Sequence, residues 1–187
     1  MSLFEYIVLA IALGLEMMIV VKACAEKNPI RLTRGLMNSA IIAIIQTLLL
    51  VSGLLIGNAL HFGYENADQL VFLGLMCVVM IRLLLRTFRK DRNIPPFNIS
   101  QVGTVALLAI ASGINVLLIG IAQGFLFFYG DCWVKAAIPL VVILFLSSFL
   151  GLMLGRQHVK IKVRRWALFE VLFLLVLSIK WAFFGME

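Results

Sequence analysis

The sequence predicts an all-α membrane protein in which six transmembrane helices form two inverted three-helix repeats. Three observations lead to this fold class: a very apolar composition, six long apolar runs, and basic residues confined to alternate connections. The 187-residue chain is 63% hydrophobic and 13% charged, and its mean hydropathy is +1.10. A water-soluble domain of this length needs far more polar surface, so the expected solvent is lipid.

Six apolar runs have the length of about 20 residues that a helix needs to cross a bilayer. Only helices and closed barrels satisfy their backbone hydrogen bonds in lipid, and runs such as LIGIAQGFLFF lack the alternation of barrel strands. We therefore treat residues 1–187 as a single transmembrane domain. The predicted spans are residues 3–25, 36–57, 69–88, 101–122, 134–155 and 164–184.

Each of the first three spans carries a polar residue within its apolar run. The first span is apolar on both sides of Glu16, the second carries Gln46 near its middle, and the third carries Arg82. A charge at mid-bilayer costs about 2.5 kcal/mol or more, so such residues usually face a cavity or a partner. Glu16 is therefore the first candidate for an ion pathway. Gln46 either lines the same cavity or bonds two helices together.

The last three spans follow a connection marked by Pro95 and Pro96, where the stretch PPFNIS leads into a helix start near Ser100. The fourth span carries Asn115 near its middle, and the sixth carries Glu170. Like Gln46, the amide of Asn115 either lines a cavity or joins two helices. Asn115 is thus the third candidate residue of the pathway.

Arg82 and Glu170 are predicted to lie at the same depth, because each is about six positions from the basic end of its helix. An ion pair is the least costly way to hold both charges in lipid. We expect such a pair, with a structural role or as an inner gate that opens and closes.

The net charge of +7 arises from bases on one side of the membrane. The connections after the first, third and fifth spans are basic, whereas those after the second and fourth carry acids and few bases. The positive-inside rule places the basic connections in the cytoplasm and both termini outside, and it explains the charge without a nucleic-acid partner. Twelve of the sixteen Lys and Arg residues follow this rule: Lys27, Arg31, Arg34, Arg86, Arg89, Lys90, Arg92, Arg156, Lys160, Lys162, Arg164 and Arg165.

An internal repeat appears when IALGLEMMIVVKACAE is aligned with IASGINVLLIGIAQGF, 99 residues later, which sets Glu16 opposite Asn115. At an offset of 98, SGLLIGN matches LGLMLGR. The repeats then cover residues 3–88 and 101–184, and an odd number of spans in each makes the second repeat inverted. Transporters are often built this way, with the substrate site near the midplane. A chance match between apolar segments is the alternative.

No pattern of an enzyme, a cofactor site or a structural metal site is present in the sequence. His61 and His158 fall in predicted loops, and no H-E-x-x-H occurs. Cys24, Cys77 and Cys132 have no C-x-x-C spacing, so we expect neither a disulfide framework nor a zinc site.

Five stretches are informative together: IVLAIALGLE, TRGLMNSAIIAIIQTLLLVSG, the third-span arginine, IASGIN and SSFLGLMLGR. Their order and spacing, over nearly the full length, resemble the small manganese efflux pumps of the lysine-exporter superfamily. In that family an Asp follows a Ser by two positions in the first and fourth spans, and the second span carries a Glu. The matching positions here are Glu16, Asn115 and Gln46, with Gly14 and Gly113 in place of serine.

The resemblance implies a bacterial inner-membrane exporter of a small cation, with Mn²⁺ as the first candidate and protons as the exchanged ion. The resemblance implies Glu16 as the metal ligand. Because hard divalent cations prefer carboxylate oxygens, one acid and two amides also allow weaker metal binding or another solute. Two alternatives stay open: a non-transporting scaffold or receptor, and an exporter of an organic solute such as an amino acid, whose ammonium group would meet Glu16.

Overall fold

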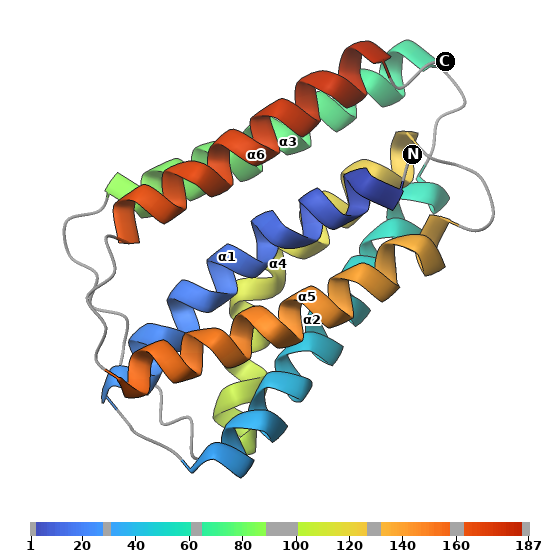
Figure 1. Cartoon of the computed structure of the whole chain (residues 1–187). Coiled ribbons are helices and arrows are strands. Elements are labelled where there is room, and N and C mark those ends of the chain that lie inside the picture. The colour runs from blue at the N-terminus through green and yellow to red at the C-terminus, as the bar shows by residue number, and fades with distance from the viewer. Residues whose placement is uncertain are drawn as a thin grey trace.

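The computed structural model describes residues 3–27, 31–60, 65–88, 101–126, 132–157 and 163–184. Six α-helices make up this part of the chain (Figure 1). The predicted all-α membrane class is confirmed, because α1 to α5 have the length and composition to cross a bilayer. The span formed by α6 stays a prediction. The helices are α1 (Leu3–Lys27), α2 (Leu32–Ala59), α3 (Glu65–Phe88), α4 (Val102–Leu126), α5 (Cys132–Arg156) and α6 (Val163–Phe184).

The helices extend beyond several of the predicted apolar runs, and α2 shows the reason. It has 28 residues, which corresponds to a length of about 42 Å. It begins after Arg31, whose backbone is extended, and the Gly35 N–H donates to the Arg31 carbonyl at 3.0 Å. A run of apolar residues marks only the part of a helix inside the hydrocarbon core, which is about 30 Å thick. The helix itself continues through the headgroup layer.

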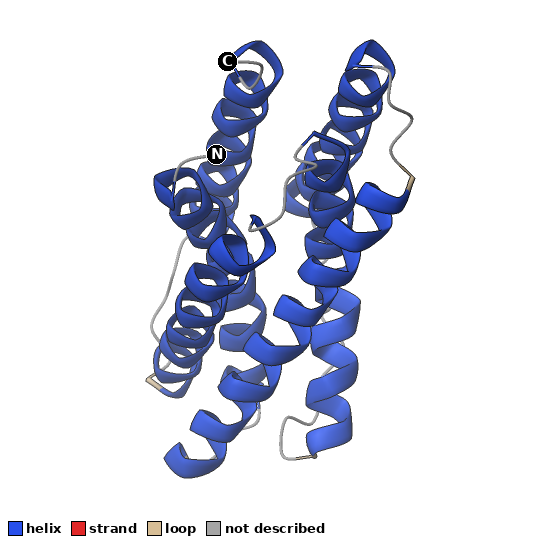
Figure 2. Cartoon of the chain, turned by 90° about the vertical axis from the view of Figure 1, so that its right-hand side faces the viewer, coloured by secondary structure: helices blue, strands red, loops and turns tan. Residues whose placement is uncertain are grey.

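Four helices, α1, α2, α4 and α5, form the packed centre of the bundle. Helix α2 packs mainly against α4, α1 packs mainly against α5, and α2 also contacts α5. Helices α3 and α6 lie side by side and cover α4 and α1, respectively (Figures 1 and 2). Each central helix is thus buried partly by helices that are distant in sequence.

Helices α2 and α4 touch backbone to backbone through glycines. A Cβ atom on Gly57 would overlap the Ile121 carbonyl oxygen, and a Cβ on Gly124 would lie 2.5 Å from the Leu54 carbonyl oxygen. Such a contact needs residues without side chains, a common device of membrane helices. Gly53 and Gly120 make equivalent contacts one turn away.

Helices α1 and α5 approach each other in the same manner. A Cβ on Gly151 would lie 2.5 Å from the Met18 carbonyl oxygen, and a Cβ on Gly155 would lie 2.6 Å from the Lys22 carbonyl oxygen. The two closest helix pairs of the bundle therefore both use glycines against a partner backbone.

The two residues of the predicted Arg82–Glu170 ion pair differ in exposure in this structure. Arg82 is exposed, whereas Glu170 is only 2% exposed. Sequence position sets depth along a helix, but contact also depends on direction around its axis. Arg82 lies about 100° from the buried face of α3. That face carries Phe72, Met76, Val79 and Leu83.

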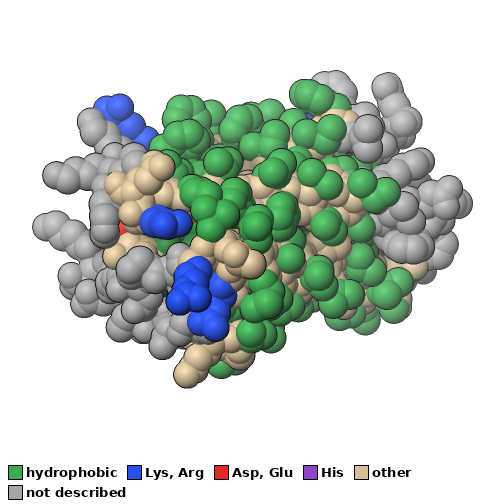
Figure 3. Space-filling view, turned by 60° about the horizontal axis from the view of Figure 1, so that its bottom comes forward, with side chains coloured by type: hydrophobic (Ala, Val, Ile, Leu, Met, Phe, Trp, Pro, Cys, Tyr) green, Lys and Arg blue, Asp and Glu red, His purple; other side chains and the backbone are tan. Residues whose placement is uncertain are grey.

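The two ends of the bundle differ in charge. In Figure 3, Lys and Arg side chains gather at one end of the face in view, and hydrophobic side chains cover its middle. Two exposed arginines, Arg31 before α2 and Arg156 at the end of α5, line one pocket together with Ala25. At the other end, where α1 begins and α6 ends (Figure 1), Lys180 forms an ion pair with Glu5.

Candidate ion site

Glu16 and Asn115, which belong to α1 and α4, meet inside the bundle. The Asn115 Nδ2 group donates to Glu16 Oε1 at 3.1 Å and to Oε2 at 3.2 Å. Their side chains are only 5% and 3% exposed, respectively. One amide group therefore bridges both oxygens of a carboxylate that is removed from solvent.

Gln46 joins the same region from α2 through a serine. Its Nε2 group donates to Ser112 Oγ at 3.0 Å, and the Ser112 hydroxyl donates to the Leu108 carbonyl at 2.8 Å. Ser112 lies three positions before Asn115, so both project from neighbouring positions on α4. Three helices thus supply one polar cluster, which we call the Glu16 cluster: Glu16, Gln46, Ser112 and Asn115.

The amide carbonyls of the Glu16 cluster are unused. Among the residues that the structure describes, Gln46 Oε1 and Asn115 Oδ1 are buried and accept no hydrogen bond. A buried acceptor without a partner is costly, by about 1–3 kcal/mol. Carboxylate and amide oxygens are also the ligands that hard cations take from proteins. The cluster thus contains oxygen groups of the kinds that a small cation takes as ligands.

The structure brings two of the three predicted pathway residues, Glu16 and Asn115, into direct contact. The third, Gln46, bonds instead to Ser112, one helical turn from Asn115 on α4. Ser112 was not predicted, although the stretch IASGIN places it one helical turn from Asn115. In the described part of the chain, no group of three or more His, Cys, Asp or Glu residues gathers. The cluster therefore combines a single acid with neutral oxygen groups.

Comparison with known families identifies the group of proteins to which the chain is related. A family described as "Putative manganese efflux pump" matches residues 29–181. The chain belongs to this family. Neither a curated protein nor a solved structure matches it. As a member of an efflux pump family, the chain is a multi-pass membrane transporter rather than an enzyme.

The matched region of this manganese efflux pump family member contains Gln46 and Asn115 but begins after Glu16. The importance of Glu16 therefore depends on its geometry, a buried carboxylate held by Asn115. The family membership supports the resemblance seen in the sequence, and hydrogen bonds connect Glu16, which precedes the matched region, with Asn115 inside it.

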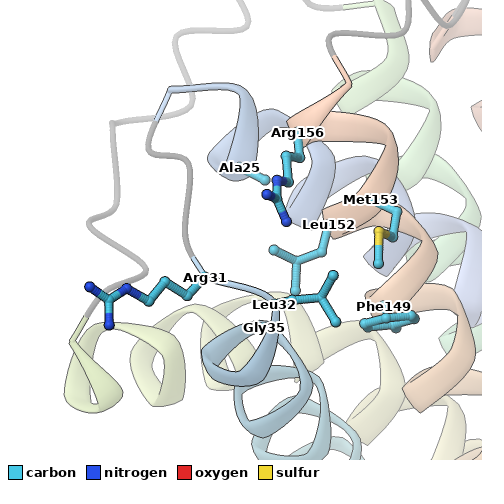
Figure 4. Close-up of a pocket in the computed structure, with 8 residues that line it drawn as sticks. All are labelled: Ala25, Arg31, Leu32, Gly35, Phe149, Leu152, Met153 and Arg156. Carbon is cyan, nitrogen blue, oxygen red and sulfur yellow. The ribbon is translucent and has the colours of Figure 1, made fainter.

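A pocket at the basic end of the bundle is chemically different from the Glu16 cluster. Arg156 reaches over its apolar residues, whereas the Arg31 guanidinium points away from them (Figure 4). One guanidinium over the pocket, with no acid in the lining, favours an anion over a cation. We therefore do not assign this pocket to a cation pathway. Its lining is Ala25, Arg31, Leu32, Gly35, Phe149, Leu152, Met153 and Arg156.

Two lysines near helix ends have specific partners. Lys22 is 6% exposed and pairs with Glu26 at 2.9 Å. Lys180 is half exposed and pairs with Glu5, which also accepts a hydrogen bond from Trp181 Nε1 at 3.3 Å. Both lysines are thus neutralised by nearby carboxylates.

Proposed function

We propose that the chain exports a small cation, Mn²⁺ first, in exchange for protons across a bacterial inner membrane, with Glu16 as the central acid. The observation that carries this proposal is the buried Glu16 carboxylate, bridged by Asn115, with two unused amide oxygens in the same cluster. A buried acid at mid-membrane is costly unless it is used. Family membership supports Mn²⁺ as the cargo.

The exchange follows from the chemistry of a single carboxylate. Moving a divalent ion out against an inside-negative potential costs about 4.6 kcal/mol per 100 mV, so export needs a second ion that moves inward. An ionised Glu16 attracts the cation, and a protonated Glu16 does not. Arrival of a proton from outside therefore releases the cation, and arrival of a cation from inside displaces the proton.

The inverted repeat is supported by the register of the helix contacts. Gly53 faces the Leu117 carbonyl, and Gly151 faces the Met18 carbonyl. The glycines are 98 residues apart and the carbonyls 99 residues apart, which are the offsets of the sequence repeat. Gly57 with Ile121 and Gly155 with Lys22 repeat the relation.

The contact between Glu16 and Asn115 joins equivalent positions of the two repeats, since they are 99 residues apart. In a pair of units related by a two-fold axis, a residue that touches its own equivalent lies on that axis. We therefore infer that the Glu16 cluster lies where the repeats meet, which is the usual position of a transporter's substrate site.

The orientation is tested by labelling introduced thiols in intact cells. Cysteines replace Leu60 or Gln157, two exposed residues at opposite ends of the bundle, in a chain whose three native cysteines are serine. We expect a membrane-impermeant reagent to label position 60 and not position 157, because the basic connections prefer the cytoplasm. Labelling of position 157 alone would contradict the orientation.

The transport function is tested with the full chain in proteoliposomes. With an imposed pH gradient, we expect Mn²⁺ flux in one direction and proton flux in the other, because both ions compete for Glu16. A fluorescent Mn²⁺ indicator and a pH dye measure the two fluxes, and protein-free liposomes are the control. Absence of Mn²⁺ flux would refute the cargo, and flux of a basic amino acid instead would favour the organic-solute alternative.

A further inference from the structure

Gln123 on α4 is a buried amide that the Glu16 cluster does not include. Its side chain is 0% exposed, and neither Nε2 nor Oε1 has a hydrogen-bond partner within the described residues. Glu16, Asn115 and Gln46 each make at least one hydrogen bond through the side chain. Asn115 and Gln123 are both buried amides on α4, and Gln123 makes fewer side-chain hydrogen bonds than Asn115.

Keeping Gln123 in this position is costly for the folded protein. Each buried polar atom without a partner costs about 1–3 kcal/mol, and no bulk water is present in a bilayer core to compensate. An apolar side chain of similar size would avoid this cost. The amide therefore adds nothing to packing that an apolar residue would not supply, and a polar group retained inside a membrane protein points to a function.

The position of Gln123 relates it to the Glu16 cluster. It follows Ser112 by 11 residues, which is about three helical turns, so both lie on one face of α4 about 16 Å apart along the axis. It also lies in the last turns of α4, towards the end of the bundle where α1 begins (Figure 1). Gln123 is too far along the axis to be a further ligand at Glu16.

We propose that Gln123 forms a second, weaker cation position, which a partly hydrated cation occupies after it leaves Glu16. This inference rests on the proposed export function. The side-chain carbonyl oxygen of Gln123 can coordinate the ion or accept a hydrogen bond from a water molecule bound to the ion. Because the amide is uncharged, it binds the ion weakly enough for release. The Glu5 carboxylate at this end is already engaged by Lys180 and Trp181, so the amide is the better candidate.

The test replaces Gln123 by Met, an apolar side chain of similar length, in proteoliposomes that carry an imposed pH gradient and Mn²⁺. We expect the maximal flux to fall about tenfold, the equivalent of about 1.4 kcal/mol in a barrier. The Mn²⁺ concentration for half-maximal flux should stay unchanged, because the Glu16 cluster is intact. The thermal unfolding midpoint should stay equal or rise, since an unsatisfied amide has been removed.

Asn58→Leu is the control, because it removes an exposed amide near the same end of the bundle, and it should keep the parent flux. Parent flux in Gln123→Met would overturn the second position while leaving the Glu16 proposal intact. A fall in flux together with a lower unfolding midpoint would also overturn it, because the amide would then be structural. A parent chain without Mn²⁺ flux would overturn both proposals.

Discussion

Replacing Glu16 by Gln should abolish cation export while the folded protein remains in the membrane at the parent level. Gln has the same size and can still bond Asn115, so the contact between α1 and α4 is kept. The negative charge is lost, and with it both the attraction for a divalent cation and the group that exchanges it for a proton. We expect the initial rate to fall by at least about 100-fold, or about 2.7 kcal/mol.

The rate of Mn²⁺ flux into proteoliposomes measures this effect, and size-exclusion chromatography measures the folded fraction. Glu26→Gln is the control, because Glu26 lies near the end of the same helix as Glu16, pairs with Lys22 and undergoes the same change outside the Glu16 cluster. It should keep export. Glu16→Asp, which retains the charge on a shorter side chain, should keep part of it. Export by Glu16→Gln at the parent rate would show that the acid is structural.

Replacing Gly57 by Ala should destabilise the protein by about 1–3 kcal/mol, the usual cost of overpacking. The added methyl group would overlap the Ile121 carbonyl oxygen and the Gly124 Cα atom. Backbone atoms cannot move aside as a flexible side chain does, so α2 and α4 must separate. Because Gln46 and Ser112 belong to these two helices, we expect export to fall as well.

Gly74→Ala is the matched control, because a Cβ atom on Gly74, within α3, would have no neighbour within 4 Å. In a helix interior the same change is normally favourable by about 0.5–1 kcal/mol. The two substitutions should therefore shift the thermal unfolding midpoint in opposite directions. Equal shifts would show that the α2–α4 contact is looser than the structure indicates.

Hydrophobicity alone predicted most of the architecture, because lipid leaves a chain few alternatives. A run of apolar residues in a bilayer must satisfy its own backbone, so the helical class follows directly. Helix ends were predicted less well, as the early start of α2 after Arg31 shows. Headgroup-level residues are polar and fall outside an apolar window, although the backbone there remains helical.

The candidate site was predicted in part. The repeat set Glu16 opposite Asn115, and the structure joins them by hydrogen bonds. Ser112 and Gln123 were not predicted as functional residues, because a serine or glutamine in an apolar helix has no distinctive pattern. The structure draws attention to Ser112 because it accepts a hydrogen bond from Gln46. It draws attention to Gln123 because that side chain is buried and has no hydrogen-bond partner among the described residues.

The sequence by itself determined the helical membrane class, the depth of each polar residue, and the identity of the single acid near the middle of the first span. These properties depend on position along one helix and on transfer from water to lipid. Only the tertiary structure decided which residues meet, because contact also requires the direction around each helix axis. The sequence predicts one depth for Arg82 and Glu170, but Arg82 is exposed and Glu170 is buried, whereas Glu16 and Asn115 meet. Glycine contacts between backbones fix how α2 meets α4 and how α1 meets α5, and in this packing the Asn115 amide lies beside the acid.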